Sequence, residues 1–103
     1  MYKLVTIYRV VDDADMLEQF FSRTHLPLAE QLPGLLEVEV SRIHGKPGGK
    51  SRFHLMIECY FESAASYEAA MTSEIGLELL GELKEWYEAK ILTWFEAESF
   101  LSE

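Results

Sequence analysis

Cysteine is almost absent from this sequence, which contains Cys59 and no other thiol among its 103 residues. A single thiol excludes an internal disulfide and a zinc site built from several thiolates of one chain. Long hydrophobic runs are also missing, and none approaches the roughly 20 residues that span a bilayer. The segment after Met1 lacks the basic start and apolar core of a secretory signal. These absences predict a cytoplasmic protein without a membrane partner.

Basic residues are scarce. The chain has 9 lysines and arginines against 18 acidic residues, which gives a formal net charge of -9. Nucleic acids and anionic lipids bind cationic surfaces, so we expect no nucleic-acid partner. A hydrophobic content of 49% and an aromatic content of 13% are too high for a disordered chain. The length predicts a single domain over residues 1–103.

Glycine is concentrated in residues 45–50, which form a short flexible stretch between two segments of alternating polarity. Residues 36–44 precede this loop and residues 53–61 follow it. Alternation with a period of two predicts strands, and the short connection predicts an antiparallel hairpin. Residues 2–11 and 91–100 are rich in β-branched and aromatic side chains and are predicted to be two further strands.

Helical spacing of apolar residues fills both long connections. The first helix begins after acidic residues at 12, 13 and 15, and Pro27 interrupts it because proline cannot donate a backbone hydrogen bond. We expect a kink there or a short second helix that runs to Leu32. In the second connection, Ser63 is the predicted N-cap of a helix over residues 64–71, and Thr72 or Ser73 can cap another helix.

The order strand, helix, strand, strand, helix pair, strand is the βαββαβ arrangement of ferredoxin-like α+β proteins. In this arrangement a four-stranded antiparallel sheet carries its helices on one face. The other face must then be covered by something else or be polar.

The two side-chain rows of the strands predict what lies on each face. We expect an apolar row to lie under the helices: Val5, Ile7, Leu55, Ile57, Cys59 and Phe61. The other row mixes aromatic, apolar and polar side chains: Leu4, Thr6, Tyr8, His54, Met56, Glu58 and Tyr60. This mixed row is too apolar to stay in water, so a second copy is expected to cover it across a two-fold axis and close a barrel.

The interior of such a homodimeric barrel is a candidate pocket for a small, largely apolar organic molecule. The predicted ligand-binding residues are those of the mixed row that carry hydrogen-bonding or bulky groups: Thr6, Tyr8, His54, Met56, Glu58 and Tyr60. A dimer core without a cavity is the alternative. For Glu58, the alternative is an ion pair with a basic neighbour such as Arg9 or Arg42.

His25 is the candidate catalytic residue, because it lies beside the Pro27 interruption and imidazole titrates near neutrality. The alternative is a structural histidine that caps a carbonyl at the kink. Neither a metal site nor a cofactor is predicted. The histidines His25, His44 and His54 belong to three different elements, and no pair has metal-ligand spacing. Cys59 is expected to be an inert core thiol.

Several short motifs resemble those of the EthD family. Residues 25–29 (His-Leu-Pro-Leu-Ala) and 32–35 (Leu-Pro-Gly-Leu) are similar to the histidine-x-proline and proline-glycine-leucine signature of that family. Residues 61–63, Tyr67 and residues 70–76 resemble its next block, a strand end followed by a helix and a serine-acid-glycine turn. The sequence departs from the family at Glu74, where a proline is common.

The resemblance implies a dimeric α+β barrel of the kind found in small lactone isomerases, polyketide cyclases and cofactor-free monooxygenases. The family takes its name from ethyl tert-butyl ether degradation. We therefore expect a homodimer that binds a small organic molecule, with cofactor-free proton transfer or oxidation at His25 as its candidate chemistry. The alternatives are a non-catalytic accessory protein or ligand carrier, and a haem-degrading monooxygenase.

Overall fold

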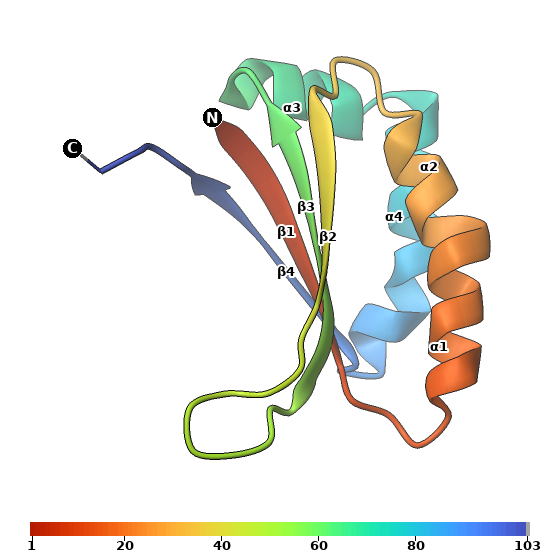
Figure 1. The fold of residues 1–103 in the computed structure, drawn as a ribbon. Helices are drawn as coiled ribbons and strands as arrows, with labels where there is room; N and C mark the ends of the chain where they lie inside the picture. Colours follow the sequence, from red (N-terminus) through yellow and green to blue (C-terminus); the bar gives the residue numbers. More distant parts are fainter. Residues whose placement is uncertain (103) are drawn as a thin grey trace.

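The computed structural model describes residues 1–102 and confirms the predicted order of elements (Figure 1). In chain order these are β1 (Tyr2–Arg9), α1 (Ala14–Phe20), η1 (Phe21–His25), α2 (Leu26–Glu30), β2 (Glu37–Arg42), β3 (Phe53–Phe61), α3 (Ala64–Met71), α4 (Glu74–Glu88) and β4 (Leu92–Glu98). The predicted bounds of β3 are correct, and the other strands end within two residues of their predicted ends.

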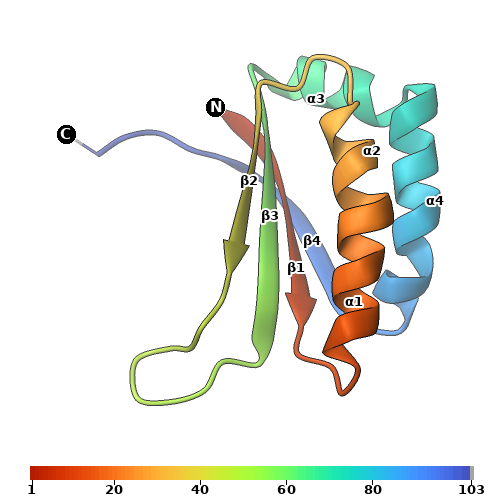
Figure 2. The ribbon, with the colours of Figure 1, turned by 45° about the vertical axis from the view of Figure 1, so that its right-hand side comes forward.

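The four strands form one antiparallel sheet in the order β2-β3-β1-β4. All helices of the described residues lie on the same side of this sheet, and the opposite face carries none of them (Figures 1 and 2). The protein therefore has a ferredoxin-like α+β fold, as the sequence predicts. The long α4 and the α1–α2 segment run side by side over the sheet.

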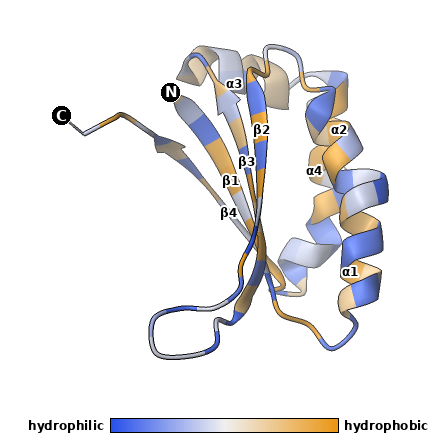
Figure 3. Ribbon diagram, viewed as in Figure 1, coloured by the Kyte–Doolittle hydropathy of each residue, from blue (hydrophilic) through white to orange (hydrophobic). Residues whose placement is uncertain are grey.

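A single hydrophobic core fills the space between the helices and the sheet. Its strand residues include Leu4, Tyr8, Leu55, Ile57, Cys59 and Phe61, and its helix residues include Leu17, Phe21, Ala29, Leu79 and Leu83. Hydrophilic and hydrophobic segments alternate along the helices, as expected when one side of each helix is buried (Figure 3).

The predicted interruption at Pro27 takes the form of a π-helical turn. Asp13 caps α1 by accepting a hydrogen bond from the Met16 backbone N–H. The helix then widens over η1, where the Leu26 N–H donates to the Phe21 carbonyl five residues earlier. Pro27 lies in the first turn of α2, where its missing N–H costs little. The widened turn leaves both Phe21 and His25 buried against the sheet.

Serine caps begin both helices of the second connection, as predicted. The Ser63 hydroxyl accepts from the Ser66 N–H at 3.2 Å, and the Ser73 hydroxyl accepts from the Gly76 N–H at 3.1 Å. A Cβ atom added to Gly76 would lie 2.2 Å from the Ala70 carbonyl oxygen. Glycine therefore allows α3 and α4 to meet at this close corner.

Among residues 1–102, no helix combines the length and the apolar character needed to cross a lipid bilayer.

Candidate functional site

The helix-free face of the sheet is the candidate site, and the strand register shows which side chains occupy it. Residues directly opposite each other in antiparallel strands point to the same face. Lys3 pairs with Tyr60, and Val5 pairs with Glu58 on one side and with Phe95 on the other. Because Tyr8 and Leu4 belong to the helix-covered core, the odd-numbered residues of β1 occupy the open face.

This register corrects the predicted rows of β1. Thr6 and Tyr8 are 2% and 0% exposed and lie on the helix-covered side, whereas Val5 and Ile7 share the open face with Met56. Both rows of β1 are apolar at their centre, so alternation alone does not fix which row faces the helices. A usable signal was present at the strand ends, because the charged residues Lys3 and Arg9 are both in the odd-numbered row.

His54 is also displaced from its predicted row. The pairing of β1 and β3 shifts between Tyr8 and Arg9, so that Arg9 lies opposite Phe53 instead of His54. This irregularity turns His54 toward the helices, where its Nε2 lies 2.7 Å from a carboxylate oxygen of Glu18 on α1. Of the predicted ligand-binding residues, the open face brings together only Met56, Glu58 and Tyr60.

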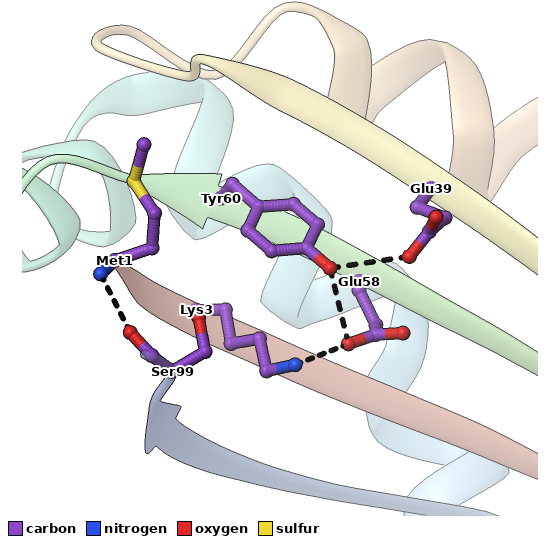
Figure 4. Close-up of polar contacts among 6 residues, drawn as sticks. All are labelled: Met1, Lys3, Glu39, Glu58, Tyr60 and Ser99. Carbon is purple, nitrogen blue, oxygen red and sulfur yellow. Dashed lines mark hydrogen bonds and ion pairs between the residues drawn. The ribbon is translucent and has the colours of Figure 1, made fainter. Parts of the chain in front are cut away.

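A polar network crosses one end of the open face (Figure 4). The Lys3 ammonium donates to Glu58 Oε2 at 2.6 Å. The Tyr60 hydroxyl lies 3.1 Å from Glu39 Oε1 and 3.4 Å from Glu58 Oε2, and so bridges two carboxylates of facing strands. Lys3 also lies over the Tyr60 ring. Glu58 therefore forms the expected ion pair with a basic neighbour, but that neighbour is Lys3 and not Arg9 or Arg42.

The network perturbs the Tyr60 phenol. Partial burial, together with the hydrogen bond to Glu39 and the charge of Glu58, raises the pKa of Tyr60 to about 12. Tyr60 therefore stays protonated at neutral pH and acts as a hydrogen-bond donor. Glu58 is 8% exposed, and the Lys3 ammonium compensates its charge.

The centre of the open face is apolar, while its β2 edge carries Glu37 and Ser41. Val5 is 3% exposed although it lies outside the helix-covered core, and Phe95 beside it is 47% exposed. Ile7 and Met56 continue this surface as a directly opposed pair. An apolar surface at the centre of a helix-free sheet face is typical of a contact or binding site.

His25 lies in the layer between the helices and the sheet. It is 2% exposed, and its Nδ1 atom is 2.6 Å from the Tyr8 hydroxyl. The rings of Phe21 and Tyr8 also pack against it. The alternative of a structural histidine had a backbone carbonyl as the partner, whereas the structure places the Tyr8 hydroxyl in that position.

Burial sets the protonation of the His25–Tyr8 pair. Burial lowers the pKa of His25 to about 4 and raises the pKa of Tyr8 well above its ordinary value of 10. At neutral pH both groups are uncharged, and one hydrogen bond joins the Tyr8 hydroxyl to His25 Nδ1. This ring nitrogen is therefore already engaged, and the catalytic role of His25 stays a prediction.

A second charged cluster holds α1 to the edge of the sheet. Glu18 accepts hydrogen bonds from Arg42 of β2 and from His54 of β3, both at 2.7 Å. The Arg42 guanidinium, followed by His54, lowers the pKa of the Glu18 carboxyl. Cys59 is buried, and burial raises the pKa of its thiol to about 12, in agreement with the predicted inert thiol.

Comparison with known proteins identifies the family. No protein-family model matches the sequence. The structure superimposes with a TM-score of 0.90 on the crystal structure of an EthD family protein from Bacillus halodurans C-125. That protein is 32% identical in sequence, and the match covers 97% of this chain and 99% of the other. The chain belongs to the EthD family.

Two further proteins are similar to this EthD chain. An uncharacterised 11.0 kDa protein of Rhodococcus erythropolis, encoded in the thcB–thcC intergenic region, is 25% identical over 76 residues, which is 74% of each chain. A dimeric ferredoxin-like protein of unknown function from Jannaschia sp. CCS1 has a TM-score of 0.66 and 22% identity, with 95% and 97% of the two chains covered. The second similarity shows the shared fold.

Proposed function

We propose that this EthD protein is a homodimer that holds a small, largely apolar organic molecule between its two open sheet faces. The observation that carries the proposal is the apolar centre of that face, formed by Val5, Ile7, Met56 and Phe95. Burial of apolar surface contributes about 25 cal/mol per Å², so covering a few hundred Å² on each copy is strongly favourable. A two-fold axis is the symmetry that lets one face cover the same face of another copy.

The polar network at one end of the face supports the binding part of the proposal. Small-molecule sites combine apolar walls with a few placed polar groups. Tyr60 offers a hydroxyl, and Lys3 and Glu58 offer a compensated pair of charges. These groups can orient a bound molecule that has one polar substituent, while Met56 and Phe95 contact its apolar body.

The contacts of His25 favour binding without catalysis, which is the accessory or carrier form of this proposal. A general base needs a free lone pair within reach of its substrate. The Nδ1 atom of His25 is hydrogen-bonded to the Tyr8 hydroxyl, and the ring is 2% exposed. We therefore propose that His25 stiffens the sheet–helix interface behind the binding face.

A charge placed at the centre of the open face tests the dimer. Met56→Glu is expected to weaken dimerisation at least about 100-fold, because an unpaired carboxylate would be desolvated in the contact. Leu77→Glu on α4 is the matched control, since Leu77 is exposed outside this face. Analytical ultracentrifugation measures both, and circular dichroism checks their folding. A native protein that sediments as a monomer at micromolar concentration contradicts the proposal.

Native mass spectrometry of freshly purified protein tests whether the dimer holds a small organic molecule. A retained molecule that is released unchanged supports the carrier, whereas its conversion by the protein indicates an enzyme. If a dimer repeatedly shows no retained mass and takes up no apolar probe, the two faces form a solid contact and the binding part of the proposal is wrong.

A further inference from the structure

A hollow of about 470 Å³ lies where the end of β1, the start of β3 and the turn from α4 into β4 meet. Its volume is in the range of small-molecule sites. Arg9, Arg52 and Lys90 provide cationic groups to its wall, and Ile7, Phe53 and Phe95 provide apolar ones. We call it the basic hollow. It combines charge of one sign with aromatic surface inside one chain.

Basic residues are few in this protein, so a cluster of three of them in one hollow is a notable feature of its surface. The chain has 9 basic residues against 18 acidic ones, and three of the 9 line the basic hollow. Within residues 1–102, the lysines and arginines that form ion pairs are Lys3, Arg42 and Lys84. None of the three cations of the basic hollow forms such a pair in this part of the chain, although acidic groups are abundant.

Backbone hydrogen bonds hold together the three segments that carry these cations. The Arg9 N–H donates to the carbonyl of Ile91, the residue after Lys90, at 2.8 Å. The Val10 N–H donates to the Arg52 carbonyl, also at 2.8 Å. The register shift that places Arg9 opposite Phe53 brings that ring to the basic hollow, and the Arg52 guanidinium lies 5.1 Å from the ring centroid. Three separate segments thus meet at the basic hollow through backbone pairing, and their cationic side chains are exposed.

Lys90 adopts a backbone conformation that normally belongs to glycine. Its φ is +62°, and no other non-glycine residue among those described has a positive φ. It follows the end of α4, where the Ile91 N–H donates to the Trp86 carbonyl in a Schellman motif. A side chain with a Cβ is disfavoured at this position. Lysine at this position therefore costs the fold stability relative to glycine.

From this cluster and this strained lysine, we propose that the basic hollow binds an organic carboxylate with an aromatic or aliphatic body. The carboxylate would lie among the three cations, and the body would contact Phe53, Phe95 and Ile7. Charge-assisted hydrogen bonds from arginine and lysine suit a carboxylate, and the aromatic rings suit an apolar body. The basic hollow adjoins the open face, because Ile7 and Phe95 belong to both. All of its wall comes from one chain, so this inference goes beyond the proposed function and does not require the dimer.

Titration calorimetry with three acids and their neutral amides tests the inference. The pairs are benzoate and benzamide, 2-naphthoate and 2-naphthamide, and decanoate and decanamide. We expect at least one acid to bind at least tenfold more tightly than its amide. We also expect its affinity to fall as salt rises, because the contact is between charges.

Three variants locate the binding. Lys90→Gly removes one cation and relieves the positive φ, so it should raise the thermal midpoint while weakening acid binding about tenfold. This combination cannot arise from misfolding. Arg52→Gln should weaken binding by a similar factor. Lys84→Gln, which removes an equal charge from α4 outside the basic hollow, should leave binding unchanged.

Several outcomes overturn the inference. These are no binding of any acid at millimolar concentration, equal binding of acids and amides, or native affinity in both Lys90→Gly and Arg52→Gln. If the native protein binds no acid and Lys90→Glu no longer forms a dimer, the three cations belong to a contact between proteins instead. Repeating the titration at protein concentrations below and above the dissociation constant of the dimer separates the two proposals, because acid binding should persist where the protein is a monomer.

Discussion

The Tyr8–His25 hydrogen bond joins the central strand of the sheet to the widened turn of the helix above it. Both residues are almost completely buried, and both are uncharged at neutral pH because burial disfavours their ionised forms. Such a pair satisfies two polar groups within an apolar layer. It also makes folding sensitive to acid through one identifiable side chain.

Between pH 7 and pH 4, stability is expected to fall because of His25. Its pKa is 6.5 in the unfolded chain and about 4 in the folded protein. In this window the unfolded state binds the extra proton, so the free energy of unfolding decreases as pH falls. The shift corresponds to about 3 kcal/mol at pH 4. Urea unfolding at pH 7, 5.5 and 4 measures it.

The control for this pH effect is His25→Gln, which keeps a polar side chain but cannot titrate. The native protein should lose about 3 kcal/mol more than this variant between pH 7 and pH 4. Carboxylates such as Glu18 titrate in both proteins and cancel in the comparison. Parallel stability curves for the two proteins would show that the pKa of His25 is the same in the folded and the unfolded chain.

At the scale of elements, the corner between α3 and α4 depends on a missing side chain. A Cβ at Gly76 would lie 2.2 Å from the Ala70 oxygen and 2.6 Å from the Met71 Cα, both of which belong to the backbone. Gly76→Ala should therefore lower the free energy of unfolding by at least about 2 kcal/mol.

Gly81 in the same helix provides the matched comparison. Nothing lies within 4 Å of a Cβ at this exposed position. Gly81→Ala should raise the free energy of unfolding by about 1 kcal/mol, because alanine favours a helix interior. Urea denaturation measures both variants. If they change stability in the same direction, the close approach at the corner does not explain why Gly76 is there.

The sequence was sufficient to predict the elements because each one carries local signals. Ser63 and Ser73 mark helix starts, and the alternation of β3 needs no knowledge of its neighbours. Which face of β1 lies under the helices was harder to predict, because both of its rows are apolar at the centre and only the charged end residues Lys3 and Arg9 mark the open row. The displacement of His54 depends on an irregularity in strand pairing that no local pattern encodes.

In the candidate site, too, the features that depend on local sequence were predictable and those that depend on strand pairing were not. Met56, Glu58 and Tyr60 lie on the open face as predicted, because β3 alternates clearly between apolar and polar positions. The partner of Glu58 is Lys3, which lies far away in sequence and adjoins it only through the pairing of β1 with β3. The basic hollow likewise combines residues from three distant segments, and residue spacing does not reveal it.

For the whole molecule, the proposed dimer makes thermal stability depend on protein concentration. Association stabilises the folded state by mass action, so the thermal midpoint should rise with concentration. With an unfolding enthalpy typical of two chains of this length, the rise is roughly 3 °C for each tenfold increase. Differential scanning calorimetry at 5 and 50 μM measures it.

Met56→Glu should abolish this concentration dependence, and Leu77→Glu should keep it. A midpoint of the native protein that stays constant over this tenfold range would indicate that the open face is not used for association.

The π-helical turn over Phe21–His25 affects how relatives should be aligned with this chain. A π-turn contains one residue more than the α-helical path through the same space, so α2 is rotated relative to α1 by that added residue. A relative with a regular helix here would need a one-residue gap inside the helix, where alignment procedures penalise gaps most heavily. Without that gap, the positions equivalent to Ala29 and Leu32 would be compared with residues from the wrong helix face.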